Sequence, residues 1–259
     1  MGTTVPMVPV RCTLSARAAA RTAGLAFGCQ GVFREDIRPG GNFGAVTANR
    51  PATAMVAAGC RWALIGHSEE REDKLGMMAA YARAAGIALD EAAAAASVGD
   101  LLNEETLRAL EAGLDVLACV GETAAERGEG TPDEQRRRVA TVLARQVERI
   151  LDGTRAFAGS RRIVMAYEPV WAIGPGKVPP GPEYIGFAAG CVKDAAASML
   201  GFEPPMVYGG GLKEENAAEI CAVPAIDGGL VALTRFTGEI GFYPEDLERI
   251  IAAARRDAG

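Results

Sequence analysis

A repeating unit of a short apolar run, a glycine-containing loop and a helical stretch most constrains how this chain can fold. The runs are nearly continuous rather than alternating, which is typical of strands buried on both faces of a parallel sheet. Strands that alternate with helices predict βαβ units. Seven such runs are countable, at residues 8–12, 25–30, 61–66, 115–121, 162–168, 205–210 and 229–234.

The stretches between the runs show helical signals. Thr131 and Glu134 match a capping box with Pro132 at the first helical position. Apolar residues follow it at the 3.6-residue spacing of one helix face. Pro244 is predicted to begin the last helix. The alanine-rich segment 72–103 is predicted to be helical, with breaks at Gly86 and Gly99.

The strand count bears on the architecture. A chain of 259 residues suits a single barrel domain over residues 1–259. A closed (β/α)8 barrel needs eight strands, but seven are countable, and only seven residues precede the first run. We therefore expect an α/β chain of the (β/α)8 type whose first βα unit is missing, unless the pattern hides a strand.

Composition excludes several classes of protein. The chain is 49% hydrophobic and 23% charged, as expected of a globular domain, and no apolar run reaches the ~18 residues of a membrane helix. A net charge of −6 argues against nucleic acid as a partner. Six cysteines without a CxxC pair indicate reduced thiols and a cytoplasmic protein. An arginine-bearing stretch without acids before Glu35 leaves a transit peptide as the alternative to an ordinary helix.

The first candidate functional segment is AYEPVWAIGPGK, residues 166–177. Glu168 stands at the carboxyl end of a predicted strand, which is the catalytic face of a (β/α)8 barrel. A glycine-containing loop follows, with Pro169 and Trp171 on one side and Lys177 on the other, and this pattern is typical of a lid. The alternative is a structural loop with a solvated glutamate.

The second candidate is His67, the only histidine, in the segment GHSEER. It follows a predicted strand and precedes a helix that we expect Ser68 to cap. A helix N-terminus would favour the neutral imidazole, which could donate a hydrogen bond to a developing oxyanion. A satisfied structural histidine is the alternative.

Two glycine-containing loops are candidate phosphate sites. In YGGGLK, residues 208–213, backbone N–H groups at a helix start could bind an anion. The run 229–234 is the last predicted strand, and phosphate sites in (β/α)8 barrels favour the loops after the last two strands. Thr234 and Arg235 could contribute a hydroxyl and a guanidinium group there. Tight structural turns are the alternative for both.

Taken together, these segments resemble the triosephosphate isomerase family. The stretch AYEPVWAIGPGK is close to the family signature, and GHSEER, CVGE (residues 119–122), YGGGLKEENAAEI and DGGLVAL occur in the family's order. The resemblance covers residues 8–251, weakly before Gln30 and strongly after Ile163. It implies a TIM barrel.

The resemblance implies roles for individual residues. Glu168 matches the catalytic base, and His67 matches the electrophile that polarises the carbonyl group. A glutamate base paired with a neutral histidine is known for the family, and the resemblance alone implies this pairing here. Glu69 matches a buried acid behind the histidine. Gly174 matches the lid amide on the phosphate, and Tyr208 the hydroxyl that holds the closed lid. No metal or cofactor is implied.

The chain also departs from the family pattern. Gly211, after Gly210, stands where a serine is usual, and Ala232 and Leu233 stand where two glycines bring amides to the phosphate. Glu70 replaces a usual arginine, while Ala45 replaces its glutamate partner. The Asn-x-Lys of the first strand has no counterpart, and no lysine precedes Lys74, although Arg11 is a candidate substitute. We therefore expect an upstream βα unit to restore full activity.

These observations predict an enzyme, an aldose–ketose isomerase that interconverts glyceraldehyde 3-phosphate and dihydroxyacetone phosphate through an enediolate, in glycolysis and gluconeogenesis. The alternatives are isomerisation of a four-carbon phosphate such as erythrulose phosphate, and a non-catalytic phosphate-binding barrel. A small sugar phosphate is the expected partner, without nucleic acid or membrane. The segment 40–47, with Phe43 as anchor, resembles the family's dimer loop and predicts a homodimer.

Overall fold

The computed structural model describes residues 7–8, 25–38, 40–41, 46, 48–174, 176–235 and 238–255. The contacts of the chain divide it into two compact units. The first consists of Met1–Cys119, Glu148–Ile163 and Met199–Gly201; the second consists of Val120–Val147, Val164–Ser198 and Phe202–Gly259. The assignment of residues 1–259 to a single domain stays a prediction.

The first unit is built on parallel strands that pair in sequence order. Its strands are β1 (Met7–Val8), β2 (Gly28–Gln30), β3 (Trp62–Ile65) and β4 (Asp115–Val120). Gly28 pairs with Met7 on one side and with Trp62 on the other, and Trp62 pairs with Asp115. All four residues of β3 are buried, as expected of a strand covered on both faces.

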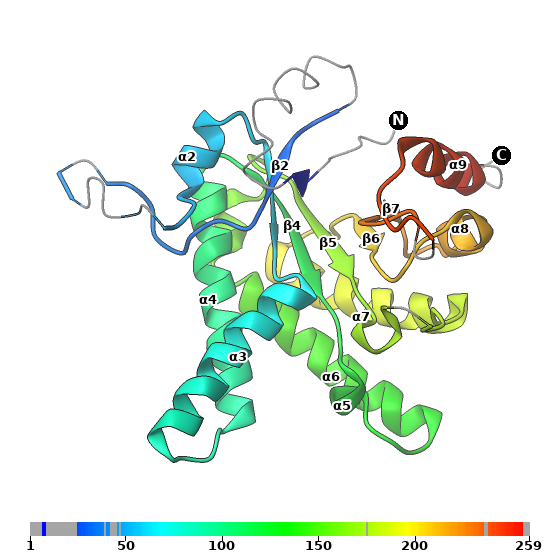
Figure 1. Ribbon diagram of the computed structural model, residues 1–259, viewed down its shortest axis with the longest axis horizontal. Helices are drawn as coiled ribbons and strands as arrows, with labels where there is room; N and C mark the ends of the chain where they lie inside the picture. The colour runs from blue at the N-terminus through cyan, green and yellow to red at the C-terminus, as the bar shows by residue number, and fades with distance from the viewer. Residues whose placement is uncertain are drawn as a thin grey trace. The chain divides into compact units, whose positions relative to one another are not determined.

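The helices of the first unit are α2 (Ala52–Ala57), α3 (Ser68–Ala85) and α4 (Glu91–Ala112), with the 3-10 turn η2 (Thr154–Phe157). Figure 1 shows α3 and α4 side by side. The two helices form a hairpin in the segment of the chain that connects β3 to β4. Helix α4 packs its apolar side on β3, whereas α3 buries only Ala82.

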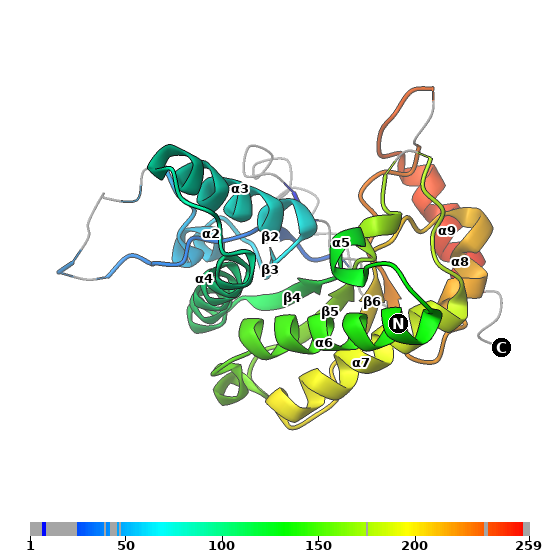
Figure 2. The same cartoon turned by 90° about the horizontal axis from the view of Figure 1, so that it is seen from below.

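The second unit repeats the parallel arrangement. Strand β5 (Ile163–Tyr167) pairs with β6 (Met206–Tyr208), which pairs with β7 (Gly228–Gly229). Its helices are α5 (Ala124–Arg127), α6 (Pro132–Ile150), α7 (Pro182–Leu200), α8 (Glu214–Cys221) and α9 (Pro244–Arg255), with the 3-10 turn η3 (Val170–Ala172). Figure 2 shows α8 and α9 packed against each other.

The predicted strands are confirmed. Each of the seven strands in the described part of the chain overlaps one of the seven apolar runs. Strand β1 overlaps its run only at Val8, because residues 9–12 lie outside the described residues. Strand β7 begins one residue before its run, at Gly228.

Most helix signals are also confirmed, but the break predicted at Gly99 is wrong. The capping box before α6 forms: Thr131 N–H donates to Glu134 Oε2 at 2.8 Å, and Glu134 N–H donates to the Thr131 hydroxyl at 3.4 Å. Gly86 ends α3 in the left-handed conformation. Gly99 does not break α4, because it lies where the Arg149 side chain packs on the helix; a Cβ there would lie 2.7 Å from Arg149 Cδ.

Two expectations drawn from composition can be compared with the structure. The five described cysteines are all free thiols. No helix in the described ranges combines the length and the apolar character that crossing a membrane requires.

Candidate active site

His67 lies two residues after the end of β3 and is itself the N-cap of α3, which corrects the prediction that Ser68 caps this helix. Its Nδ1 accepts a hydrogen bond from the backbone N–H of Glu69 at 3.3 Å. An Nδ1 that accepts carries no proton, so the neutral ring bears its proton on Nε2. The cap therefore selects the tautomer in which Nε2 can donate.

The peptide before His67 is held on both sides. Gly66 N–H donates to Glu70 Oε2 at 2.7 Å, and Gly66 O accepts from Arg71 Nε at 2.8 Å. Arg71 Nη2 also donates to Cys119 O at 2.8 Å. Gly66 has φ +81°, and a Cβ there would lie 2.8 Å from Cys119 O. Only glycine fits this position, which fixes where His67 leaves the strand.

Glu69 does not have the expected burial. It lies in the first turn of α3 with an exposed side chain. Its backbone N–H, rather than its carboxylate, contacts His67. The acid that the fold encloses here is the next residue, Glu70, because the turn of the helix points that side chain toward Gly66.

Glu168 lies directly after β5 and is 2% exposed. Its N–H donates to Val120 O at 2.9 Å, which ties the end of β5 to the last residue of β4. Gly209 makes room for the carboxylate, because a Cβ there would lie 3.2 Å from Glu168 Cγ and 3.6 Å from Oε1. A buried carboxylate next to glycine can reach a substrate atom with little freedom to swing away.

The backbone of Glu168 is supported by Gly121, at the end of β4. A Cβ on Gly121 would lie 1.8 Å from Glu168 O, so no other residue fits. Gln146 of α6 binds both polar groups of this glycine: Gly121 N–H donates to Gln146 Oε1 at 3.0 Å, and Gln146 Nε2 donates to Gly121 O at 2.9 Å.

The beginning of the loop after Glu168 is anchored on a buried carboxylate, Glu122. One oxygen, Oε1, accepts from Trp171 Nε1 at 2.7 Å, from the Tyr184 hydroxyl at 2.8 Å and from the Tyr167 hydroxyl at 3.1 Å. The other oxygen is buried without a hydrogen-bond partner. Burial raises the pKa of Glu122 above its usual value, although the three donors oppose this.

The tip of the same loop contrasts with its anchor. Gly174, with φ +117°, Lys177 and Val178 are all exposed, and a backbone hydrogen bond of 3.2 Å joins Lys177 N to Gly174 O. A fixed base and a solvent-exposed glycine tip are what a lid requires.

The loop after β6 is packed tightly on Tyr208. The buried Tyr208 hydroxyl donates to Gly210 O at 3.0 Å, and a Cβ on Gly210 would lie 2.1 Å from that hydroxyl. Gly211, with φ +83°, follows, and Asn216 Nδ2 donates to its carbonyl at 3.2 Å. The loop therefore needs glycine at these positions to adopt its conformation. Helix α8 begins three residues after Gly211.

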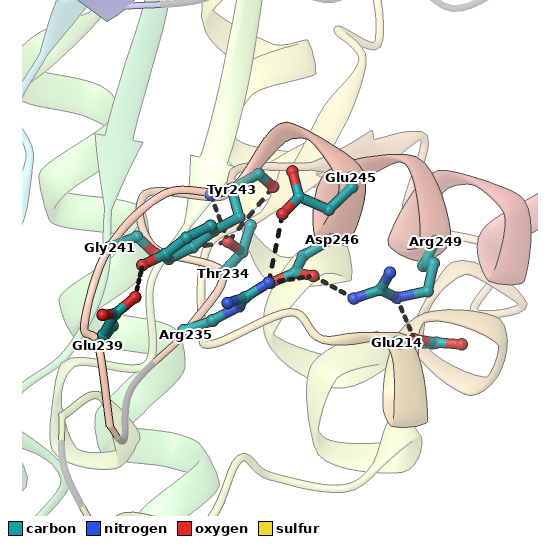
Figure 3. A network of polar contacts seen from close by, with 9 residues as sticks. All are labelled: Glu214, Thr234, Arg235, Glu239, Gly241, Tyr243, Glu245, Asp246 and Arg249. Carbon is teal, nitrogen blue, oxygen red and sulfur yellow. Dashed lines mark hydrogen bonds and ion pairs between the residues drawn. The ribbon is translucent and has the colours of Figure 1, made fainter.

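In the loop after β7, the polar candidates for phosphate binding have partners within the protein. Ala232 and Leu233 are exposed. Thr234 accepts from Tyr243 N at 2.8 Å, and Arg235 Nε donates to Asp246 Oδ2 at 2.7 Å. Figure 3 shows this network, in which Arg235 also stacks on the Tyr243 ring, 3.6 Å from its centroid. Both side chains are thus engaged within the loop and α9.

The structure assigns the candidates to the two units. His67 and Glu69 belong to the first; Glu168, Gly174, Tyr208, Gly210, Gly211, Ala232 and Leu233 belong to the second. Within the second unit, Gly209 and Gly210 bring the end of β6 against Glu168 and Pro169. Residues 42–45, with Phe43, and Arg11 lie outside the described residues.

Sequence reasoning missed several supporting residues: Glu70, Lys74, Glu105, Glu122 as a lid anchor, and Gln146. The i,i+4 spacing of Glu70 and Lys74 is a signal that could have been used. Nothing in the sequence pairs Gln146 with Gly121. No group of three or more His, Cys, Asp or Glu side chains suited to a metal ion occurs in the part of the chain that the structure describes.

Parallel strands that alternate with helices, with candidate functional side chains at the strand ends, are typical of α/β-barrel enzymes. The family model for triosephosphate isomerase matches residues 3–239. The chain belongs to the triosephosphate isomerase family.

Individual relatives of the chain point to the same family. The triosephosphate isomerase of Halorhodospira halophila is 34% identical over 84% of this chain and 75% of its own length. That of Alkalilimnicola ehrlichii is 32% identical over 92% and 80%. A crystal structure of triosephosphate isomerase from Bartonella henselae superimposes with a TM-score of 0.62 at 26% identity, over 88% of this chain and 78% of that one. The chain therefore has the TIM-barrel fold and is an isomerase, an intramolecular oxidoreductase; a non-catalytic barrel is not supported.

Proposed function

We propose that the chain interconverts glyceraldehyde 3-phosphate and dihydroxyacetone phosphate. The observation that carries this proposal is the buried carboxylate of Glu168, placed at the end of β5 and at the first residue of a lid-like loop. Membership of the triosephosphate isomerase family supports the three-carbon substrate. A four-carbon phosphate finds no support in these comparisons.

Glu168 is the general base of the proposed reaction. Its carboxylate removes a proton from the carbon next to the carbonyl, which gives the enediolate, and returns it to the former carbonyl carbon, while a proton moves from the hydroxyl oxygen to the former carbonyl oxygen. The packing of Gly209 and Gly121 around Glu168 supports this role, because proton transfer requires a fixed donor–acceptor geometry.

His67 is the electrophile. Its Nε2–H donates to the substrate oxygen on which negative charge develops, and a preorganised donor of this kind stabilises the transition state. The hydrogen bond from Glu69 N–H to Nδ1 supports this role, since it leaves the proton on Nε2. Glu69 acts through its backbone.

Backbone amides bind the phosphate. We assign them to Gly174 of the lid, to Gly210 and Gly211 after β6, and to Ala232 and Leu233 after β7. The exposed positions of Gly174, Ala232 and Leu233 are compatible with ligand access. Closure of the lid excludes water from the enediolate, with Tyr208 holding the closed loop. The reaction needs no metal or cofactor.

The decisive experiment follows isomerisation of glyceraldehyde 3-phosphate and exchange of its carbon-bound proton in deuterated water. We expect the chain to catalyse both, and Glu168→Asp to lower kcat by roughly 100-fold or more, because the carboxylate withdraws by one methylene. Catalysis of erythrulose phosphate isomerisation alone would contradict the substrate. A Glu168→Asp variant with near-parental kcat would contradict the base.

The assembly and location of the protein follow from the same proposal. We propose a cytoplasmic homodimer that acts in glycolysis and gluconeogenesis, with the loop around Phe43 docked on the neighbouring subunit. Light scattering at tens of micromolar should give twice the mass of the 26.9 kDa chain. A monomer at that concentration would refute the dimer.

A further inference from the structure

A buried group of three charged side chains lies behind His67, and the reaction described above does not use it. Lys74 Nζ lies 3.0 Å from Glu70 Oε1 and 3.0 Å from Glu105 Oε1. The side chains of Lys74, Glu70 and Glu105 are only 14%, 22% and 8% exposed. Glu70 and Lys74 come from α3, and Glu105 comes from α4. We call these residues the acid–lysine cluster.

If both acids of the cluster are ionised, the buried site carries a net charge of one negative unit, since Lys74 compensates only one of them. Glu105 Oε2 is buried without a hydrogen-bond partner, and both carboxylates contact the same ammonium group, Lys74 Nζ, at 3.0 Å. Two carboxylates that share one buried site repel each other, which favours protonation of one of them. A single proton makes the cluster neutral.

The proton belongs on Glu105. Burial, and then the hydrogen bond and charge of Glu70, raise the pKa of Glu105 to about 8. Burial alone would raise the pKa of Glu70, but the hydrogen bond with Glu105, the charge of Lys74 and the Gly66 N–H together lower it. Arg71 on α3, and Arg50, which shares the neighbourhood of Gly31 with Glu70 Oε1, add positive charge beside Glu70.

The ionised end of the cluster contacts the catalytic strand end. Glu70 Oε2 accepts the Gly66 N–H at 2.7 Å, and Gly66 precedes His67. We propose that Glu70 is a positioning residue for His67, kept ionised by Lys74 and by one proton resident on Glu105. This inference rests on the proposed role of His67. It goes beyond that role because it assigns a function to Glu70, a residue that the proposed reaction does not use.

Three variants test the inference. Glu70→Ala removes the acceptor of the Gly66 N–H, Glu105→Gln imitates the protonated acid, and Glu72→Gln alters an exposed glutamate of the same helix as a control. Since His67 is the only histidine of the chain, the ring nitrogens give one set of 15N NMR signals, which report tautomer and ionisation independently of activity.

We expect Glu70→Ala to shift the His67 ring signals and to lower kcat roughly tenfold or more, because one fixed backbone group is lost. Glu105→Gln should keep the neutral-pH signals and kcat, as should Glu72→Gln. If Glu70→Ala does not fold, Glu70→Gln keeps the size of the side chain without its charge and should shift the same signals. Unchanged His67 signals in every folded Glu70 variant would overturn the proposal.

The pH dependence gives a second readout. Because the pKa of Glu105 is raised in the folded protein, the stability that its protonated form provides is present at low pH and is lost as pH rises toward about 8. The parent should therefore lose more Tm between pH 5 and pH 9 than Glu105→Gln does. Equal losses would place the proton elsewhere and overturn the assignment. If the parent shows no isomerase activity, the NMR and Tm results still decide the positioning role.

Discussion

Two glycines at strand ends have the same structural task in this chain. Gly66 precedes His67, and Gly121 lies against the Glu168 carbonyl. In each case a helix later in the chain supplies side chains that bind both the N–H and the C=O of the glycine: Glu70 and Arg71 of α3 for Gly66, and Gln146 of α6 for Gly121. The backbone beside each proposed catalytic residue is therefore held through a glycine that neighbouring side chains bind.

Gly66 and Gly86 form a matched pair for a stability test. Both have positive φ, but a Cβ on Gly66 meets Cys119 O at 2.8 Å, whereas nothing lies within 4 Å of a Cβ on Gly86. Gly86→Ala should cost about 1 kcal/mol for the left-handed backbone alone. Gly66→Ala adds a steric clash and should cost roughly 3 kcal/mol or more.

Urea unfolding and steady-state kinetics measure the two effects separately. Gly86→Ala should leave kcat at the parental level, because this residue only ends α3. Gly66→Ala should lower kcat strongly, because His67 is displaced. Similar unfolding free energies and similar kcat values for the two variants would show that Gly66 does not position His67.

The candidate site residues and the residues that support them differ in how they are encoded. Glu168, His67 and the glycine loops stand in short contiguous motifs, so a local pattern was enough to propose them, and their roles stay predictions. The contacts of Glu105 with Lys74, and of Gln146 with Gly121, join residues 31 and 25 positions apart, and no local pattern encodes them. Glu69 was mistaken for the buried acid because one residue changes the direction of a side chain by about 100° on a helix.

At the scale of secondary-structure elements, the lid is joined to the helix that follows it. Trp171 in η3 and Tyr184 in α7 bind the same oxygen of Glu122, and their rings make an edge contact with centroids 5.6 Å apart. The Arg127 guanidinium lies 4.1 Å from the centre of the Trp171 ring. The two ends of the loop therefore share one anchor, while its glycine tip is exposed.

Glu122→Gln tests this anchor. The amide keeps one acceptor but adds N–H donors to a buried position that already lacks a partner, so we expect a loss of about 1–3 kcal/mol in unfolding free energy. The raised pKa of Glu122 makes the parent lose stability as pH rises through that pKa. The Tm difference between parent and variant should therefore shrink as pH rises.

Thermal unfolding between pH 4 and pH 9 provides the measurement, with Glu129→Gln as the control, since that side chain is exposed in the same region. A Tm difference that grows with pH would contradict the raised pKa. A variant as stable as the control at every pH would show that the carboxylate does not anchor the lid.

Some secondary-structure elements were predicted correctly from the sequence, and one predicted boundary was wrong. The strands were recovered because seven buried runs separate cleanly from the helices. The break predicted at Gly99 failed, because the intrinsic cost of glycine in a helix, about 1 kcal/mol, is overridden where a neighbouring side chain, here Arg149, needs the space. Thr234 and Arg235 contact Tyr243 and α9 in the structure, and their proposed role in phosphate binding stays a prediction.

At the scale of the whole molecule, the family, the fold and the kind of reaction could be predicted from the sequence, since they depend on motifs whose order spans most of the chain. The assembly could not be tested in the same way, because the segment around Phe43 lies outside the described residues. The single-domain organisation likewise stays a prediction.

Because the chain has few lysines, the exposed lysine at the lid tip can be labelled selectively. The chain has 27 basic residues, of which only Lys74, Lys177, Lys193 and Lys213 are lysines. Lys74 and Lys193 are mostly buried in ion pairs with carboxylates, whereas Lys177 and Lys213 are exposed. In a Lys213→Arg background, an amine-reactive fluorophore would have Lys177 as its only exposed lysine. Lid movement could then be followed optically without introducing a new cysteine.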